Sequence, residues 1–123
     1  MAKNIIKSGA KSTPEVRHER DGLFVFIETK NVLIPYAAIL YVEAQGSYCR
    51  IHLRDKKVVK VTKRMSLVEE CLPPSHFVRV HYSFIVSLFD ITEVAGSTLY
   101  LGEKYLPIGR VYRERLIDNL NIL

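Results

Sequence analysis

The residues of this chain best suited to chemistry lie in the segment 77–88, which reads FVRVHYSFIVSL. Arg79, His81, Tyr82 and Ser83 can all donate hydrogen bonds, two of them can carry a positive charge, and no acidic residue lies among them. The apolar, β-branched and aromatic residues around them predict a short strand that carries these side chains to a rim. Donors gathered without carboxylates suit a polyanion such as nucleic acid.

The distribution of charge points to the same kind of partner. The chain has 123 residues and a formal net charge of +5, with 18 Lys and Arg against 13 Asp and Glu. Residues 45–82 contain eight cations and three anions, so this central third has an excess equal to that of the whole chain. A length of this order suits one domain with one core, and the concentrated charge favours an anionic partner.

The sequence offers little for catalysis or metal binding. His81 and Ser83 are close together, but no acid lies nearby to orient the histidine, and Gly-x-Ser-x-Gly, a P-loop and paired carboxylates are all missing. Cys49 and Cys71 form no CxxC motif, and we expect both to be core thiols. We therefore expect no enzyme activity, no cofactor and no metal. The apolar runs are too short to span a membrane, and a cytoplasmic location is the simplest interpretation.

Short strands are the elements expected to position these residues. We interpret residues 1–21 as a linker or flexible tail and residues 22–123 as the folded domain. Residues 23–27 and 32–34 predict a buried hairpin that turns at Lys30 and Asn31. Further strands are expected at residues 39–44, 48–54, 58–63, 90–94, 98–101 and 105–108, and a short one within residues 77–88.

The strand at residues 48–54 alternates between an apolar and a basic face. Residues 58–63 are expected to pair with it so that Leu53 lies opposite Val59 and His52 lies beside Lys60. The basic face would hold Arg50, His52 and Lys60. These side chains contact phosphates or form an ordinary solvated surface, and the sequence leaves both open.

Two helices are expected. Ser66 and Glu69 have the spacing of a capping box, which predicts a short helix that ends before Pro73. Its buried stripe would be Leu67, Val68, Cys71 and Leu72. Residues 111–120 predict a C-terminal amphipathic helix. Arg110 falls in its first turn, where a positive charge is unfavourable, so we expect this arginine to contact an anion or a guanine edge, or else a loop carbonyl.

In order and spacing, the segments 39–44, 48–53, 66–67, 77–86 and 106–110 resemble the LytTR DNA-binding domain family, with RVHYSFIV as the most specific part. The resemblance implies a mostly β fold: an elongated stack of small antiparallel sheets with one short internal helix and a C-terminal helix. It also implies the output domain of a bacterial two-component response regulator, with a receiver domain if the chain is part of a longer one. It further implies loops that enter the major groove of double-stranded promoter DNA at paired direct repeats, and dimerisation on DNA.

Carried onto this sequence, the resemblance and the charges together give two groups of contact residues. Base contacts are expected from Gln45, Ser47, Tyr48, His81, Tyr82 and Arg110, and phosphate contacts from Arg50, Lys60, Lys63, Arg79 and Ser83. Tyr82, Ser87 and Gly109 depart from the residues common in the family. The sequence thus predicts a sequence-specific DNA-binding regulator. The alternative is a non-catalytic β-rich module that docks an acidic protein; RNA binding has less support because no aromatic pair alternates along one strand.

Overall fold

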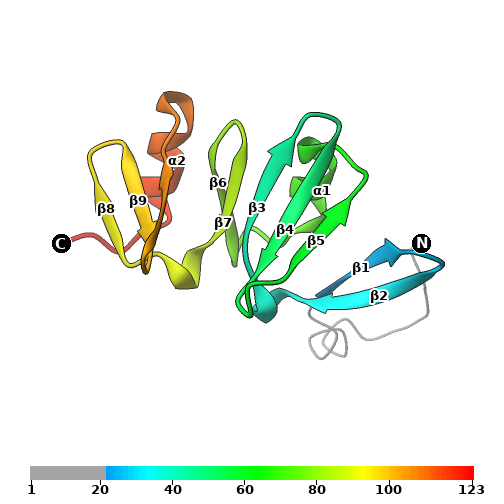
Figure 1. Cartoon of the computed structure of the whole chain (residues 1–123). Coiled ribbons are helices and arrows are strands. Elements are labelled where there is room, and N and C mark those ends of the chain that lie inside the picture. Colours follow the sequence, from blue (N-terminus) through cyan, green and yellow to red (C-terminus); the bar gives the residue numbers. More distant parts are fainter. Residues whose placement is uncertain (1–21) are drawn as a thin grey trace, which may run out of the picture.

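The computed structural model describes residues 22–123, which form three antiparallel sheets and two α-helices (Figure 1). The elements are β1 (Gly22–Ile27), β2 (Lys30–Pro35), the 3-10 turn η2 (Tyr36–Ala38), β3 (Ile39–Gln45), β4 (Tyr48–Leu53), β5 (Val58–Val61), α1 (Met65–Cys71), β6 (Phe77–His81), β7 (Phe84–Ser87), the 3-10 turn η3 (Leu88–Asp90), β8 (Glu93–Ala95), β9 (Thr98–Leu101), β10 (Lys104–Pro107), the 3-10 turn η4 (Arg110–Tyr112) and α2 (Arg113–Asp118). β1 and β2 form a hairpin, five strands pair in the order β5-β4-β3-β7-β6, and three pair in the order β10-β9-β8. The sheets follow one another along a long axis, which confirms the predicted elongated, mostly β fold.

The five-stranded sheet is amphipathic because side chains alternate along its strands. On one face Val42, Cys49 and Ile51 are buried. The β1–β2 hairpin and α1 cover this face, and they contribute Val25 and Val68 to the same core.

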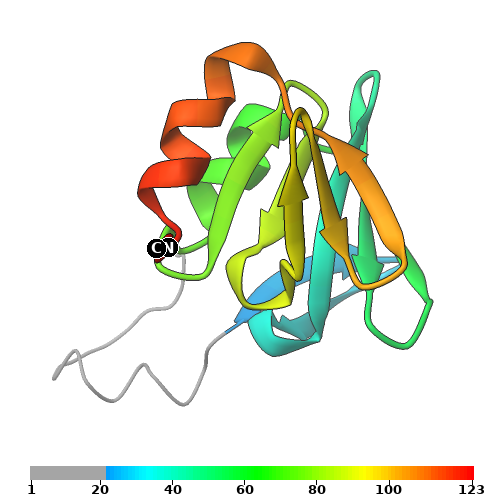
Figure 2. The same ribbon diagram turned by 90° about the vertical axis from the view of Figure 1, so that its left-hand side faces the viewer.

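The other face of this sheet builds a second core on its β6–β7 side. Val80 and Val86 pack with Leu99 and Leu106 from the three-stranded sheet and with Leu116 from α2. Figure 2 shows α2 on one side of this region and the three-stranded sheet on the other. The polar side chains of β4 and β5 remain outside both cores.

The N-terminal hairpin differs from its prediction in two ways. Ile27 pairs with Lys30, so the turn is residues 28–29 and not residues 30–31. The predicted burial on both faces was wrong as well, because Phe24 and Phe26 are 59% and 66% exposed. Only the inner side of this two-stranded sheet packs on the core.

The pairing of β4 with β5 is shifted by two residues from the predicted register. Ile51 lies opposite Val59, and Arg50 lies opposite Lys60. A shift of two keeps each side chain on its predicted face, because side chains alternate with a period of two. The predicted neighbour of His52 was nevertheless wrong, since Val58 occupies that place.

Helix α1 does not use the predicted capping box. It begins at Met65 without a side-chain cap, so Ser66 lies inside the first turn. Met65, Val68 and Leu72 are buried at helical spacing, whereas Leu67 and Cys71 are exposed. The prediction of a core thiol therefore holds for Cys49 and is wrong for Cys71, because the buried stripe lies on another side of the helix.

The C-terminal elements are shorter than predicted. Residues 88–90 form a 3-10 turn before β8, and the predicted helix at 111–120 is a 3-10 turn followed by α2. The linker expected at residues 1–21 lies outside the described residues. Within residues 22–123, neither helix has the length and apolar content needed to cross a membrane.

Candidate nucleic-acid interface

Three segments that are distant in sequence meet at one end of the molecule, which we call the loop end: the β3–β4 turn (residues 45–48), the β6–β7 turn (residues 81–84) and residues 109–111. All three lie at the upper end in Figure 1. The backbone N–H of Ala44 donates to the carbonyl of Ser83 at 2.9 Å, and that of Gly109 donates to the carbonyl of Val80 at 2.7 Å. Backbone hydrogen bonds therefore hold the β6–β7 strands against both other segments.

The β3–β4 turn brings its three predicted contact residues together. Gln45 lies opposite Tyr48, and Gly46 has a φ of +63°, a conformation that favours glycine. Gln45 Nε2 donates to a carboxylate oxygen of Glu43 at 3.0 Å. Lys60 Nζ lies 4.3 Å from the centroid of the Tyr48 ring, in cation–π geometry. The amide of Gln45, the exposed Ser47 and the Tyr48–Lys60 pair thus form one polar surface.

The β6–β7 turn presents side-chain donors in a defined arrangement. The backbone N–H of Ser83 donates to Nδ1 of His81 at 3.0 Å. A neutral imidazole that accepts at Nδ1 carries its proton on Nε2, so the far side of the ring is a donor. Tyr82 is 72% exposed, which leaves its ring and hydroxyl available to a ligand.

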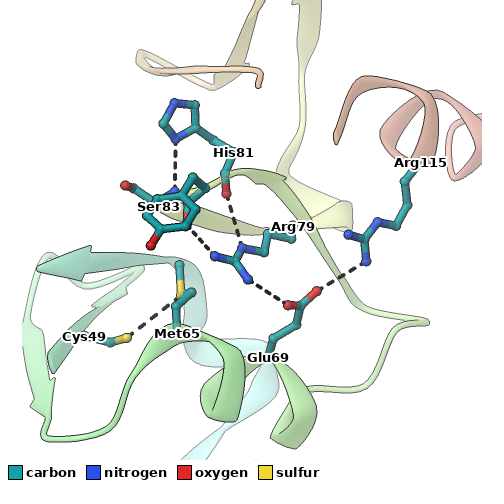
Figure 3. Close-up of polar contacts among 8 residues, drawn as sticks. Cys49, Met65, Glu69, Arg79, His81, Ser83 and Arg115 are labelled. Carbon is teal, nitrogen blue, oxygen red and sulfur yellow. Dashed lines mark hydrogen bonds and ion pairs between the residues drawn. The ribbon is translucent and has the colours of Figure 1, made fainter. Parts of the chain in front are cut away.

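Arg79 supports this turn from within the protein (Figure 3). Its Nη2 donates to the carbonyl of Tyr82 at 2.6 Å, its Nε to the carbonyl of His81 at 3.4 Å, and its Nη1 to Glu69 at 3.1 Å. Its Cζ also lies 5.6 Å from the centroid of the Tyr82 ring and 5.5 Å from that of Tyr112. The side chain is only 11% exposed, so internal contacts occupy the guanidinium that the sequence suggested for a phosphate.

Arg110 is exposed at the start of η4, and within residues 22–123 its side chain has no hydrogen bond or ion pair. Gly109 lets this segment pack closely. A Cβ at that position would lie 3.0 Å from Cδ2 of Tyr112 and 3.4 Å from Cα of His81. Val111, which the sequence did not suggest, is 82% exposed beside Arg110. An arginine and an aliphatic side chain therefore stand next to the β6–β7 turn.

The basic residues lie on the β4–β5 side of the loop end. Arg50 is half-buried between Glu43 on β3 and Lys60 on β5, and Lys60 and Lys63 are exposed. His52 is engaged elsewhere, because its Nε2 lies 2.9 Å from Oε1 of Glu43. The structure thus places Lys60 beside the Tyr48 turn and gives His52 an internal partner.

The sequence did not reveal the residues that hold the loop end together. Glu69 accepts from Arg79 and also from Nη1 of Arg115 at 3.3 Å, and Arg115 Cζ lies 5.9 Å from the centroid of the Tyr112 ring. The spacing of Ser66 and Glu69 had instead predicted that Glu69 belongs to a capping box. Only the fold brings both arginines to this carboxylate.

Other parts of the described chain have different properties. A cavity of about 400 Å³ lies between β1, the end of β5 and α1, and apolar side chains such as Leu23, Val61 and Leu67 line it. Within residues 22–123, no group of three or more His, Cys, Asp or Glu residues could hold a metal ion. Burial raises the pKa of the Cys49 thiol, which favours the neutral form in the core.

The chain matches a family model and is similar in sequence to known regulatory proteins. Residues 29–121 match the family model of the LytTr DNA-binding domain. The chain is 30% identical over 131 residues to the sensory transduction protein LytT of Bacillus cereus, which covers 94% of this chain and 53% of that protein. It is 34% identical over 87 residues to the transcriptional regulatory protein YpdB of Escherichia coli, which covers 68% of this chain and 34% of that protein. The chain thus spans about half or less of the length of these relatives.

A solved structure with a similar fold is a LytTr DNA-binding domain from Bacillus cereus. The superposition has a TM-score of 0.69 and covers 83% of this chain and 98% of that chain. Because the two sequences are only 19% identical, this likeness concerns the fold.

Proposed function

Because this chain belongs to the LytTr DNA-binding domain family, we propose that it serves a transcriptional regulator by binding duplex promoter DNA through the loop end. One observation carries the proposal: the β3–β4 turn, the β6–β7 turn and residues 109–111 meet at one end, joined by backbone hydrogen bonds of 2.9 and 2.7 Å. The major groove displays a different pattern of donors and acceptors for each base pair. Side chains on adjoining loops can read such patterns.

The two groups of residues have separate roles in this proposal. Base edges are read by Gln45, Ser47, Tyr48, His81, Tyr82 and Arg110. Phosphates are bound by Arg50, Lys60, Lys63 and Ser83, which sets the register of the domain on the duplex. Arg110 can form a bidentate pair with guanine, because its guanidinium is free of internal ion pairs among the described residues. Arg79 is assigned to support of the β6–β7 turn, because each of its three nitrogens already donates a hydrogen bond within the protein and the side chain is only 11% exposed.

The wider setting of the domain is also part of the proposal. The relatives are about twice as long as the match or longer, and their names describe sensory transduction and transcriptional regulation. We propose that the chain acts in the bacterial cytoplasm as the output domain of a response regulator, with a receiver domain in the same protein. Paired direct repeats in the promoter and dimerisation on DNA belong to this proposal. The assigned role is binding, without a catalytic step.

The test is selection of preferred duplexes from a random-sequence library, followed by fluorescence anisotropy at about 50 mM and about 200 mM salt. The proposal expects enrichment of a defined sequence and a selected duplex that binds at least about a thousandfold more tightly than an unselected one. The protein-interaction alternative expects no sequence preference. Uniform weak binding that salt abolishes would therefore contradict the DNA-reading role.

A further inference from the structure

We propose that Glu69 is a positioning residue for DNA recognition. It fixes the guanidinium of Arg79, and through Arg79 it sets the geometry of the β6–β7 turn relative to residues 109–111. This inference rests on the proposed DNA-binding function. Glu69 is acidic, so DNA phosphates repel it, and it supports recognition by positioning Arg79 and not by contacting DNA.

Glu69 links three elements of the fold (Figure 3). Its Oε1 accepts from Arg79 on β6 at 3.1 Å, and its Oε2 accepts from Arg115 on α2 at 3.3 Å. The side chain is 30% exposed and projects from α1, so each oxygen of the carboxylate binds a different arginine. Charge-assisted bonds of this kind are the stronger hydrogen bonds in proteins, and here they join α1 to β6 and to α2, with the less exposed Arg79 as the closer partner.

Arg79 transmits this position to the β6–β7 turn. The same guanidinium that binds Glu69 donates to the carbonyls of His81 and Tyr82 at 3.4 and 2.6 Å. A planar fork in which each of the three nitrogens donates to a different acceptor is held in one orientation. Without the carboxylate, Nη1 of Arg79 loses its partner inside the protein, and the guanidinium is free to rotate away from the turn.

The same pair of arginines reaches residues 109–111 through Tyr112. Arg79 and Arg115 lie 5.5 and 5.9 Å from the centroid of the Tyr112 ring. The backbone N–H of Tyr112 in turn donates to the carbonyl of Gly109 at 3.0 Å. A displaced Tyr112 would therefore move Gly109 and with it Arg110.

Electrostatics and positioning make opposite predictions for a change at Glu69. Removing a negative charge near DNA strengthens phosphate binding on every sequence. Loosening Arg79 instead weakens binding only where bases are read, because base contacts require a defined geometry. Glu70 provides a matched control, since it is the next residue of α1, is exposed, and has no ion-pair partner within residues 22–123.

The experiment compares Glu69→Gln and Glu69→Asp with Glu70→Gln and Glu70→Asp. Affinity is measured by anisotropy on a duplex that the wild-type chain selects from a random library and on an unselected duplex of the same length. We expect both Glu69 variants to lose about tenfold in the ratio of the two affinities, the size of one base contact. Glu69→Asp keeps the charge but is too short to reach both arginines, so its loss isolates geometry from charge. Both Glu70 variants are expected to keep the wild-type ratio.

A second readout observes Arg79 directly. In a ¹⁵N–¹H spectrum, the Nε–H signal of Arg79 should shift or broaden in both Glu69 variants and stay unchanged in the Glu70 variants. A wild-type affinity ratio in both Glu69 variants would overturn this inference while leaving DNA binding in place. If the wild-type chain itself selects no sequence, the proposed function fails first. Thermal unfolding of each variant separates a loss of fold from a loss of positioning.

Discussion

The β6–β7 turn and the β3–β4 turn stand side by side at the loop end, but they are built in opposite ways. The β6–β7 turn is held by a distant network, in which Arg79 binds its carbonyls and Glu69 binds Arg79. The β3–β4 turn depends on its own backbone, with Gly46 at a φ of +63° and no atom within 4 Å of the position a Cβ would take.

This difference teaches how one surface can combine fixed and adaptable contacts. A turn whose carbonyls are bound by a nearly buried arginine keeps its side chains in one geometry, as discrimination between bases requires. A turn with open space around its glycine can adjust to the shape of the duplex. We therefore infer that the β6–β7 turn supplies most of the sequence discrimination and the β3–β4 turn more of the accommodation to shape.

The largest effect is expected from Arg79→Gln, which removes the guanidinium that binds the carbonyls of the β6–β7 turn. The change leaves Oε1 of Glu69 and two backbone carbonyls without their donor, in a place where the arginine side chain is only 11% exposed. We expect the free energy of unfolding in urea to fall by about 2 to 4 kcal/mol. Lys60→Gln, on the exposed β5 strand, is the control and should change it by less than about 0.5 kcal/mol. Equal stabilities would mean that Arg79 does not support the turn.

Arg110→Ala should have the next largest effect, on binding and not on stability. Arg110 is exposed and unpaired within residues 22–123, so its loss should change the free energy of unfolding by less than about 0.5 kcal/mol. Binding to a selected duplex should weaken by about 1 to 3 kcal/mol, with relaxed preference at one base pair. Anisotropy on selected and random duplexes measures both. Equal weakening on the two would show that Arg110 binds phosphate only.

Gly46→Ala probes the turn that depends on its own backbone. The substitution meets no neighbour, but it places a side chain at a positive φ, so we expect a loss of about 1 kcal/mol in urea unfolding. Gly46→Asn should lose less, because asparagine tolerates the left-handed region. A loss as large as that of Arg79→Gln would remove the contrast between the two turns.

The sequence predicted the faces of the strands and not their exact partners. Alternation at residues 48–54 placed Cys49 and Ile51 in the core, because a strand forces successive side chains to opposite sides. The register of β4 with β5 was missed, since a shift of two residues leaves the same faces in contact. The exposure of Phe24 and Phe26 was missed for another reason. An apolar run has no alternation that would show which face is uncovered.

The candidate site likewise contains residues that the sequence predicted and residues that it did not. His81, Tyr82 and Arg110 were suggested by their residue types and by a family resemblance, both of which depend on local segments, and the structure brings those segments together. The contacts of Glu69 join residues that are 10 and 46 positions apart in the sequence. No local pattern encodes such contacts, and the spacing of Ser66 and Glu69 favoured a different explanation that the helix start at Met65 excludes.

Lys60→Ala should have the smallest effect. It tests whether the β3–β4 side of the loop end contacts the DNA backbone. Lys60 lies over the Tyr48 ring beside the β3–β4 turn, whereas Lys57 lies in the turn at the opposite end of the β4–β5 hairpin. Each neutralised phosphate contributes about one unit to the slope of the logarithm of affinity against the logarithm of salt concentration. We expect Lys60→Ala to reduce that slope by about one unit on selected and random duplexes alike, and Lys57→Ala to leave it unchanged. If both lysines reduce the slope equally, the charge acts from a distance and the β3–β4 side makes no defined phosphate contact at Lys60.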